Sequence, residues 1–227
     1  MNRVAIRIAV AASLLVAASS AQANVLNGSF EQPPVPPGNF TTFPVGSPLI
    51  PAWTVFGPAG TDVAIVSTTF SQSGVSFPAQ EGIQWMDLTG FGSNSTAGVS
   101  QAINTTPGNQ YQLSLHVGNT TGGVGFGTTS TVNVLVNDIQ TFSDVNDTVS
   151  AASLNWELFT HTFIASGPVT TLAFQNGDPS SDNANGLDNV VVVDLGPAVT
   201  PVPEPGTLAL MAIGLAAVSM GRKRKKA

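Results

Sequence analysis

Short segments of apolar or alternating residues, separated by turn residues, follow one another along the chain from residue 63 onward. This pattern is typical of β-strands. Residues 111–118 are the clearest example, because most of their apolar residues occupy alternate positions, as a strand with one buried face requires. We predict eight strands, at residues 63–69, 83–88, 99–103, 111–118, 131–136, 158–164, 169–175 and 188–194.

Turn residues separate these predicted strands, and no helical period is found before residue 206. Proline, glycine, asparagine and aspartate favour the tight turns that connect antiparallel strands. Such residues cluster at 107–109, 137–138, 166–168 and 176–179. Eight or nine strands at this spacing predict an all-β fold, a jelly-roll β-sandwich.

Residues 33–58 contain eight of the sixteen prolines in the chain. Proline lacks a backbone donor and fixes its φ angle, so it disrupts regular hydrogen-bonded elements. We therefore predict a long surface connection over this range, partly in the polyproline II conformation and without regular secondary structure.

The first 23 residues have the three parts of a secretory signal peptide. Arg3 and Arg7 give a positive start, residues 8–18 form an apolar stretch, and residues 21–23 (Ala-Gln-Ala) form a small-residue cleavage site. The sequence thus predicts an exported protein, with a signal peptide at 1–23 and a folded domain at 24–195.

The C-terminal end begins with a proline-rich linker at 196–205 and continues with an apolar stretch at 206–221. A helix over that stretch would be about 24 Å long, short of the roughly 30 Å hydrocarbon core of a bilayer. The basic tail at 222–227 compensates for the short span, because its side chains reach the interface and hold this end in the cytoplasm. Its five basic residues are Arg222, Lys223, Arg224, Lys225 and Lys226. We therefore predict a short transmembrane helix at 206–221.

The order of these C-terminal parts resembles the PEP-CTERM sorting signal of exported bacterial proteins, with Pro203, Glu204 and Pro205 as the signature triplet. The resemblance implies that an exosortase, a membrane-embedded cysteine protease, removes the tail during delivery to the cell surface or extracellular matrix. The alternative is an ordinary C-terminal anchor that follows a proline-rich hinge.

Charge is distributed very unevenly along the chain. All seven lysines and arginines lie in the predicted signal peptide and tail, so residues 24–204 carry the thirteen acidic residues and no compensating cation. A segment at −13 cannot neutralise phosphates, which excludes nucleic-acid binding by the usual route, but it can attract a divalent cation. The chain has no cysteine, which excludes disulfides and thiolate metal sites.

Several short motifs between residues 25 and 194 resemble those of galactose-binding-like jelly rolls, which include calcium-containing carbohydrate-binding modules and a family of plant cell-wall proteins. The motifs are Asn-Gly-Ser-Phe-Glu at 27–31, Glu-Gly at 81–82, Asp-Leu at 87–88, Val-Ser-Gln at 99–101, Pro-Gly-Asn-Gln-Tyr at 107–111 and Gly-Leu-Asp-Asn-Val-Val at 186–191. The resemblance implies a jelly-roll domain of a class that chiefly binds ligands.

The same resemblance implies a structural calcium ion held by Glu31 and Asp188, because the first and last strands of those modules lie near one another. Carboxylates and backbone carbonyls suit this hard cation. The alternative is that Glu31 is a solvated residue at a strand end and that Asp188 caps a turn. The loop at 178–188 does not fit an EF-hand, because Val192 stands where the bidentate glutamate is required.

Aromatic residues offer a possible stacking platform for sugar rings, although a sandwich of this size needs most of them in its core. The candidates are Trp53, Trp85, Trp156, Phe91 and Phe126. We expect Trp85 in the core, because it lies within a predicted strand. We expect that one of Phe91 and Phe126, each between two glycines in a loop, is the more exposed.

Catalysis is not expected, because the chain has two histidines, His116 and His161, no Gly-x-Ser-x-Gly motif and no lysine or arginine at 24–204 to stabilise an oxyanion. Two hypotheses stay open for this exported protein. The first is a non-catalytic module that binds extracellular polysaccharide. The second is a structural protein of the cell surface or biofilm matrix with no defined ligand.

Overall fold

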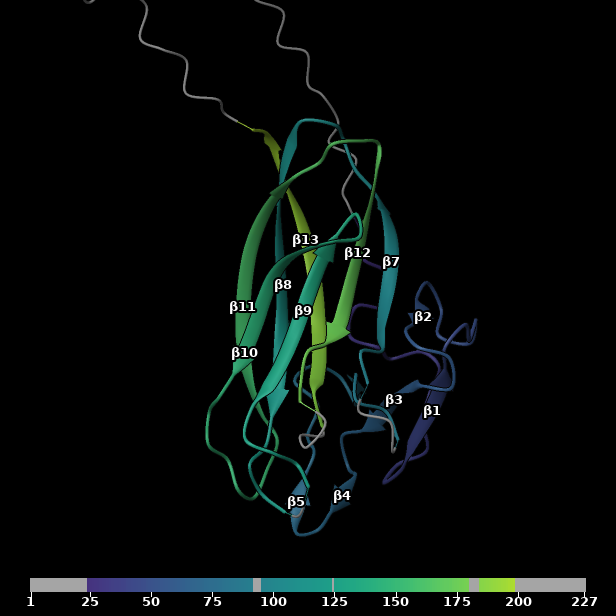
Figure 1. The fold of residues 1–227 in the computed structure, drawn as a ribbon, viewed down its shortest axis with the longest axis vertical. Helices are drawn as coiled ribbons and strands as arrows, with labels where there is room; N and C mark the ends of the chain where they lie inside the picture. The colour runs from purple at the N-terminus through teal and green to yellow at the C-terminus, as the bar shows by residue number, and fades with distance from the viewer. Residues whose placement is uncertain (1–23, 92–94, 124, 180–183, 199–227) are drawn as a thin grey trace, which may run out of the picture. The chain divides into compact units, whose positions relative to one another are not determined.

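The computed structural model describes residues 24–91, 95–123, 125–179 and 184–198. The predicted signal peptide, Pro203-Glu204-Pro205 triplet, transmembrane helix and basic tail therefore lie outside the described residues. The described residues form an all-β domain, shown in Figure 1, and belong mostly to one compact unit that runs to Gly196. No helix within these ranges has the length and apolar character needed to cross a membrane.

Two antiparallel sheets and one short hairpin make up the domain. The six-stranded sheet has the order β1-β3-β6-β13-β8-β11, the five-stranded sheet has the order β10-β9-β12-β7-β2, and β4 pairs with β5. The strands are β1 (Phe40–Pro44), β2 (Thr54–Phe56), β3 (Asp62–Ser67), β4 (Ser71–Gln72), β5 (Val75–Ser76), β6 (Gln84–Asp87), β7 (Gly98–Asn104), β8 (Asn109–Asn119), β9 (Ser130–Val136), β10 (Ile139–Asn146), β11 (Asn155–Ile164), β12 (Val169–Asn176) and β13 (Gly186–Pro197). The predicted jelly-roll β-sandwich is confirmed.

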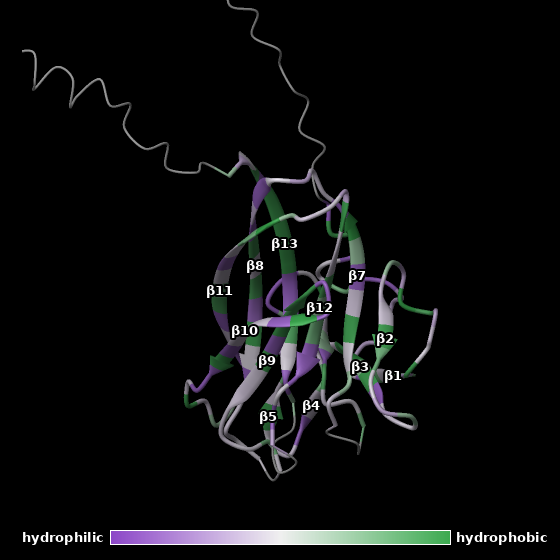
Figure 2. Ribbon diagram, turned by 45° about the horizontal axis from the view of Figure 1, so that its top comes forward, coloured by the Kyte–Doolittle hydropathy of each residue, from purple (hydrophilic) through white to green (hydrophobic). Residues whose placement is uncertain are grey.

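The main core lies between the two sheets and follows the alternation seen in the sequence. On β8 the side chains of Tyr111, Leu113, Leu115 and Val117 are fully buried, while the residues between them are partly exposed. Figure 2 shows hydrophobic and hydrophilic residues alternating in bands along β8. Burial of apolar side chains between the sheets is the main force that holds them together.

The prediction of no strand within residues 33–58 was wrong. β1 pairs antiparallel with β3, and β2 pairs with β7. Phe43 and Val55 are buried in the core, so each short strand gains enough apolar contact to form despite the neighbouring prolines. Pro44 is tolerated because β1 is an edge strand and Pro44 is its last residue.

Strand β10 was also missed, although the turn before it was predicted. Asn137 and Asp138 have φ angles of 51° and 65°, as the two-residue turn of a β-hairpin requires. The register shifts between Gln140 and Phe142, and this irregularity breaks the simple alternation that would have marked the strand. The hairpin β4–β5 is too short to give any periodic signal.

Candidate functional site

The six-stranded sheet is covered by apolar side chains on both of its faces. Val63 and Ile65 of β3 point into the main core, whereas Ala64 and Val66 belong to a second buried cluster. This explains why β3 reads as an almost unbroken apolar run in the sequence. The second cluster also contains Trp85 of β6, so it lies on the outer face of the sheet.

Aromatic rings form a continuous chain across this outer face. Their centroids are 5.7 Å apart for Phe91 and Phe40, 5.5 Å for Phe40 and Phe70, and 5.5 Å for Phe70 and Phe77. From Phe77 the chain continues to Trp85 at 6.2 Å and, on a second branch, to Phe126 at 5.2 Å. Trp85 is 1% exposed, whereas Phe40 is 36% and Phe91 69% exposed. The chain of rings thus runs from a buried end to an open one.

Two indole N–H groups hold the segment that carries Phe77 in place. Trp85 Nε1 donates to the Phe77 carbonyl at 3.1 Å, and Trp156 Nε1 donates to the Pro78 carbonyl at 2.9 Å. The two indoles also pack edge to face, with centroids 5.7 Å apart. Because both polar atoms are satisfied, the tryptophans can be buried at little cost.

A cleft of about 440 Å³ opens beside these rings. Its volume falls within the roughly 300–1,000 Å³ that is typical of sites for small ligands. The residues that line the cleft come from strands β1, β3 and β6, from strand β4 of the hairpin β4–β5 and from neighbouring loops. Figure 1 shows this hairpin at the lower end of the domain. Its lining includes Phe40, Phe70, Phe77, Trp85, Phe91 and Phe126, together with the polar residues Ser71, Gln72, Asp87 and Thr89.

Asp87 is the only ionisable residue that lines the described part of the cleft. Its Oδ1 accepts hydrogen bonds from the Thr89 N–H at 3.0 Å and the Thr89 hydroxyl at 2.7 Å. Burial raises the pKa of Asp87 to about 7 despite these bonds, and the nearby charge of Asp62 acts in the same direction. Asp62 itself accepts the Phe91 N–H at 2.8 Å and so holds the exposed ring at the cleft rim.

Gly90 is required between these two carboxylates. It has a φ angle of 64°, and a Cβ atom there would lie 2.1 Å from Asp62 Oδ1 and 2.4 Å from the Asp62 carbonyl oxygen. Any other residue would therefore push the rim loop away from β3. The Gly-Phe-Gly sequence that suggested exposure of Phe91 thus has a specific structural cause.

The structure brings the predicted calcium ligands to the same loop. Asp188 Oδ2 accepts the N–H groups of Gln80 at 2.9 Å and Glu81 at 3.0 Å. Glu31 Oε1 accepts the N–H groups of Ile83 at 2.9 Å and Gln84 at 3.2 Å. The two carboxylates therefore hold the two ends of the loop at 80–84.

This pair fits calcium only in part. Two carboxylates are suitable oxygen ligands for a hard cation. Burial raises the pKa of Asp188 to about 7, because the negative charge of its ionised form is not offset by enough favourable interactions. Several of their lone pairs already accept backbone N–H groups, however. Within the described ranges, no three His, Cys, Asp or Glu side chains lie close enough to hold a metal. Calcium at Glu31 and Asp188 stays a prediction.

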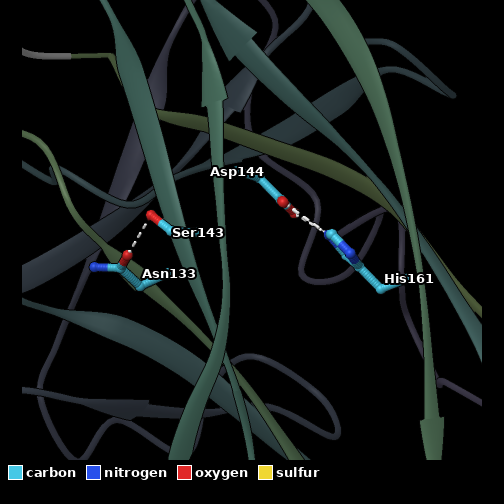
Figure 3. Close-up of polar contacts among 4 residues, drawn as sticks. All are labelled: Asn133, Ser143, Asp144 and His161. Carbon is cyan, nitrogen blue, oxygen red and sulfur yellow. Dashed lines mark hydrogen bonds and ion pairs between the residues drawn. The ribbon is translucent and has the colours of Figure 1, made fainter.

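His161 is paired with Asp144. Its Nε2 lies 2.7 Å and 2.9 Å from the two carboxylate oxygens of Asp144, as Figure 3 shows. The Phe142 ring stacks on the imidazole at 3.9 Å. Since His161 is on β11 and Asp144 on β10, the pair joins the edge strands of the two sheets. Neither residue lines the cleft.

The aromatic predictions can now be compared with the structure. Trp85 is buried and Phe91 is the exposed member of the loop pair, while Phe126 is 8% exposed. The cleft itself was missed, because its walls come from residues that are far apart in sequence. The one local signal for the cleft was Phe91, which lies between two glycines in the loop that follows β6.

Solved structures with low identity to this chain include carbohydrate-binding modules and an enzyme. The xylan-binding CBM22-1 domain of Paenibacillus barcinonensis Xyn10C is 17% identical over 72% of this chain and 98% of its own, with a TM-score of 0.39. TmCBM61, solved with β-1,4-galactotriose, is 15% identical over 76% and 98%, with a TM-score of 0.43. An isomalto-dextranase of Arthrobacter globiformis T6, in complex with panose, is 17% identical over 68% of this chain and 23% of its own, with a TM-score of 0.41.

No curated protein sequence matches the chain. Residues 201–225 match the PEP-CTERM protein-sorting motif, which confirms the sorting signal inferred from Pro203, Glu204 and Pro205. Residues 23–193 match the model of a family described as a protein of unknown function. Because this match covers more than half of the chain and nearly all of the β-sandwich, the chain belongs to the DUF642 family.

Proposed function

We propose that this is an exported, surface-sorted protein whose β-sandwich binds extracellular polysaccharide without catalysis, at the aromatic cleft on the outer face of the six-stranded sheet. The observation that carries the proposal is the chain of rings that ends in the exposed, stacked pair Phe40 and Phe91. Exposed aromatic rings beside a carboxylate provide both interactions that a sugar requires. The C–H face of the sugar packs on the rings, and its hydroxyl groups donate to the carboxylate in its ionised form.

Export and sorting rest on the C-terminal motif. A PEP-CTERM signal implies an exosortase as a processing partner, with the predicted helix as a transient membrane anchor. This sorting would place the protein at the cell surface or in the extracellular matrix, where polysaccharide is a main component. A neutral polysaccharide is a ligand that suits an acidic domain without lysine or arginine.

The absence of catalysis is supported by the composition of the site. Residues 24–204 provide no lysine or arginine to stabilise developing negative charge. In the described part of the cleft, Asp87 is a single carboxylate, whereas glycoside hydrolysis usually requires two that flank the bond. His161 is engaged with Asp144 away from the cleft.

One observation favours the second candidate, a structural matrix protein. The outer face of the five-stranded sheet carries small neutral residues, such as Ser100, Ala102, Asn133 and Thr171, beside the exposed side chains of Val145 and Val169. Figure 3 shows one of its polar contacts, where the Ser143 hydroxyl donates to Asn133 Oδ1 at 2.9 Å. A neutral face of this kind suits weak, repeated contacts with matrix material, and these contacts should not depend on the aromatic rim.

A glycan array with the full-length protein, run with and without calcium, tests the proposal. We expect binding to fall about fivefold or more in each of Phe91→Ala and Phe40→Ala, since stacking on one ring contributes about 1 kcal/mol beyond buried area. Ile139→Ala is the matched control, because Ile139 is equally exposed at 70% but lies on β10. Binding that survives both phenylalanine substitutions would contradict the site, and no binding to any glycan would favour the matrix role.

A further inference from the structure

The charge of the cleft restricts the sugars that it can hold. No lysine or arginine occurs between residues 24 and 204, and neither histidine lines the cleft. A carboxylate or sulfate group on a polysaccharide would therefore meet no cationic side chain. Asp62 at the rim, and Asp87 within the cleft where the pH is high enough to ionise it, would instead repel such a group.

Backbone N–H groups are donors that proteins commonly use to bind anions, beside neutral side chains such as Ser71 and Gln72, and two of them at this rim are already engaged. The Thr89 N–H donates to Asp87 Oδ1 at 3.0 Å, and the Phe91 N–H donates to Asp62 Oδ1 at 2.8 Å. The rim loop thus directs these donors at its own carboxylates. An anionic sugar would have to displace one of them.

Asp87 is in turn placed to accept hydrogen bonds from a ligand. Both bonds from Thr89 end on Oδ1, and the Asn185 N–H also donates to the carboxyl group, which still leaves lone pairs for a ligand. Asp87 lines the cleft together with Trp85 and Phe126. Burial raises the pKa of Asp87 to about 7, so above this pH the group is mainly the ionised carboxylate. In that form it has about four lone-pair positions and no donor, so it selects a ligand that presents hydroxyl groups. Hydrogen bonds to a charged acceptor are about twice as strong as neutral ones, which makes Asp87 the main polar anchor.

We propose that the cleft selects uncharged glycans and rejects those that carry uronic acid or sulfate groups, with Asp87 as the residue that accepts the sugar hydroxyls. This inference rests on the proposed function, because it names the class of carbohydrate for the same site. The cleft volume of about 440 Å³ limits the bound portion to a short segment of the chain.

Affinity electrophoresis of the full-length protein at pH 8, where Asp87 is mainly ionised, provides the test. The probes are soluble neutral glucans and galactans and the same polymers oxidised to carboxylates at C6, so each pair differs only in charge. We expect the protein to bind at least one neutral polymer, and its oxidised partner at least about tenfold more weakly, as like charges at short range require.

Two substitutions sharpen the result. Asp87→Asn keeps an oxygen for the Thr89 donors, so it should fold, but we expect it to weaken binding of the neutral polymer about ten- to a hundredfold. Gln72→Lys adds a cation to the cleft wall and should improve binding of the oxidised polymer about three- to tenfold, in a manner that added salt removes. Asp138→Asn, in the remote β9–β10 turn, is the control for net charge and should change neither.

The outcomes separate this inference from the proposed function. If the oxidised polymer binds as tightly as the neutral one and Phe91→Ala abolishes both, the cleft binds carbohydrate but the inference about charge is overturned. Equal binding of the neutral polymer by Asp87→Asn and the unmodified protein would overturn the role of Asp87. If no neutral or oxidised polymer binds at all, the proposed function fails together with the inference.

Discussion

The two faces of the six-stranded sheet are both covered by apolar side chains, yet they differ in composition and in origin. The inner face at β8 is built by regular alternation of residues such as Leu113 and Leu115, which are fully buried. The outer face is built of aromatic rings from β1, β6 and several loops, and it remains open at Phe91. One face closes the sandwich, and the other leaves a cleft of about 440 Å³.

The outer face also carries carboxylates that burial deprives of water. Met86 and Leu187 are paired and lie in the inner core, so their neighbours Asp87 and Asp188 point to the outer side by alternation. Burial raises the pKa of both to about 7. The difference between the faces teaches that the outer one holds buried carboxyl groups at a cost in stability at neutral pH, whereas the inner one is purely apolar packing at these positions.

Removing one large side chain from each face should show this division most strongly. Trp85→Ala should lower the free energy of unfolding by about 3–5 kcal/mol, and Leu115→Ala by about 2–5 kcal/mol, because both side chains are at most 1% exposed. Only Trp85 lines the cleft, so only its loss should weaken glycan binding by the molecules that remain folded. Urea denaturation and affinity electrophoresis measure the two effects. An equal loss of binding in Leu115→Ala would mean that the faces are not separable.

Stability should depend on pH through the outer face. The folded state raises the pKa of Asp87 and Asp188 from 3.8 to about 7, so folding favours the protonated forms. Each group therefore contributes stability that is fully present below about pH 4 and is lost as the pH rises towards 7, on the order of 3 kcal/mol per group. Urea denaturation between pH 4 and 8 should show this decline in the absence of calcium.

Asparagine variants identify the groups responsible for the pH dependence. Asp87→Asn and Asp188→Asn should each flatten the decline by about half, since an amide does not titrate. Asp138→Asn, in the exposed turn, should leave it unchanged. A stability maximum near pH 7 in the unmodified protein would contradict the charge state assigned to the outer face.

The sequence was sufficient to predict the inner face but not the outer one. In residues 111–118, apolar and polar residues alternate and so predict a strand, because every second side chain of a regular strand points into the core. The outer face depends on contacts such as that between Phe40 and Phe91, which no local period encodes. Strand β1 was missed for the same reason, since its formation depends on pairing with β3 and burial of Phe43 rather than on its own pattern.

The predicted ligands of calcium show the same limit. The resemblance to calcium-containing modules singled out Glu31 and Asp188, and both proved to hold the loop at 80–84. The sequence could not reveal that backbone N–H groups already occupy part of each carboxylate. Two explanations of the pair are left. Glu31 and Asp188 hold the loop at 80–84 by hydrogen bonds alone (the hydrogen-bonded clasp), or a cation bound between them completes this arrangement.

Calcium addition separates these accounts and gives the smallest of the three expected effects. If the ion binds only the folded state, a hundredfold excess over Kd should raise the free energy of unfolding by about 2.7 kcal/mol. That corresponds to a rise in Tm of roughly 5–11 °C, at about 2–4 °C per kcal/mol.

The rise in Tm should be larger at pH 8 than at pH 5, because the cation requires the ionised form of Asp188. Magnesium should raise the Tm less than calcium, because it demands tighter octahedral geometry. Glu31→Gln and Asp188→Asn should abolish most of the calcium effect, while Asp138→Asn should not. Equal responses to both metals that persist in the Glu31 and Asp188 variants would reduce the effect to charge screening and leave the hydrogen-bonded clasp as the full account of the pair.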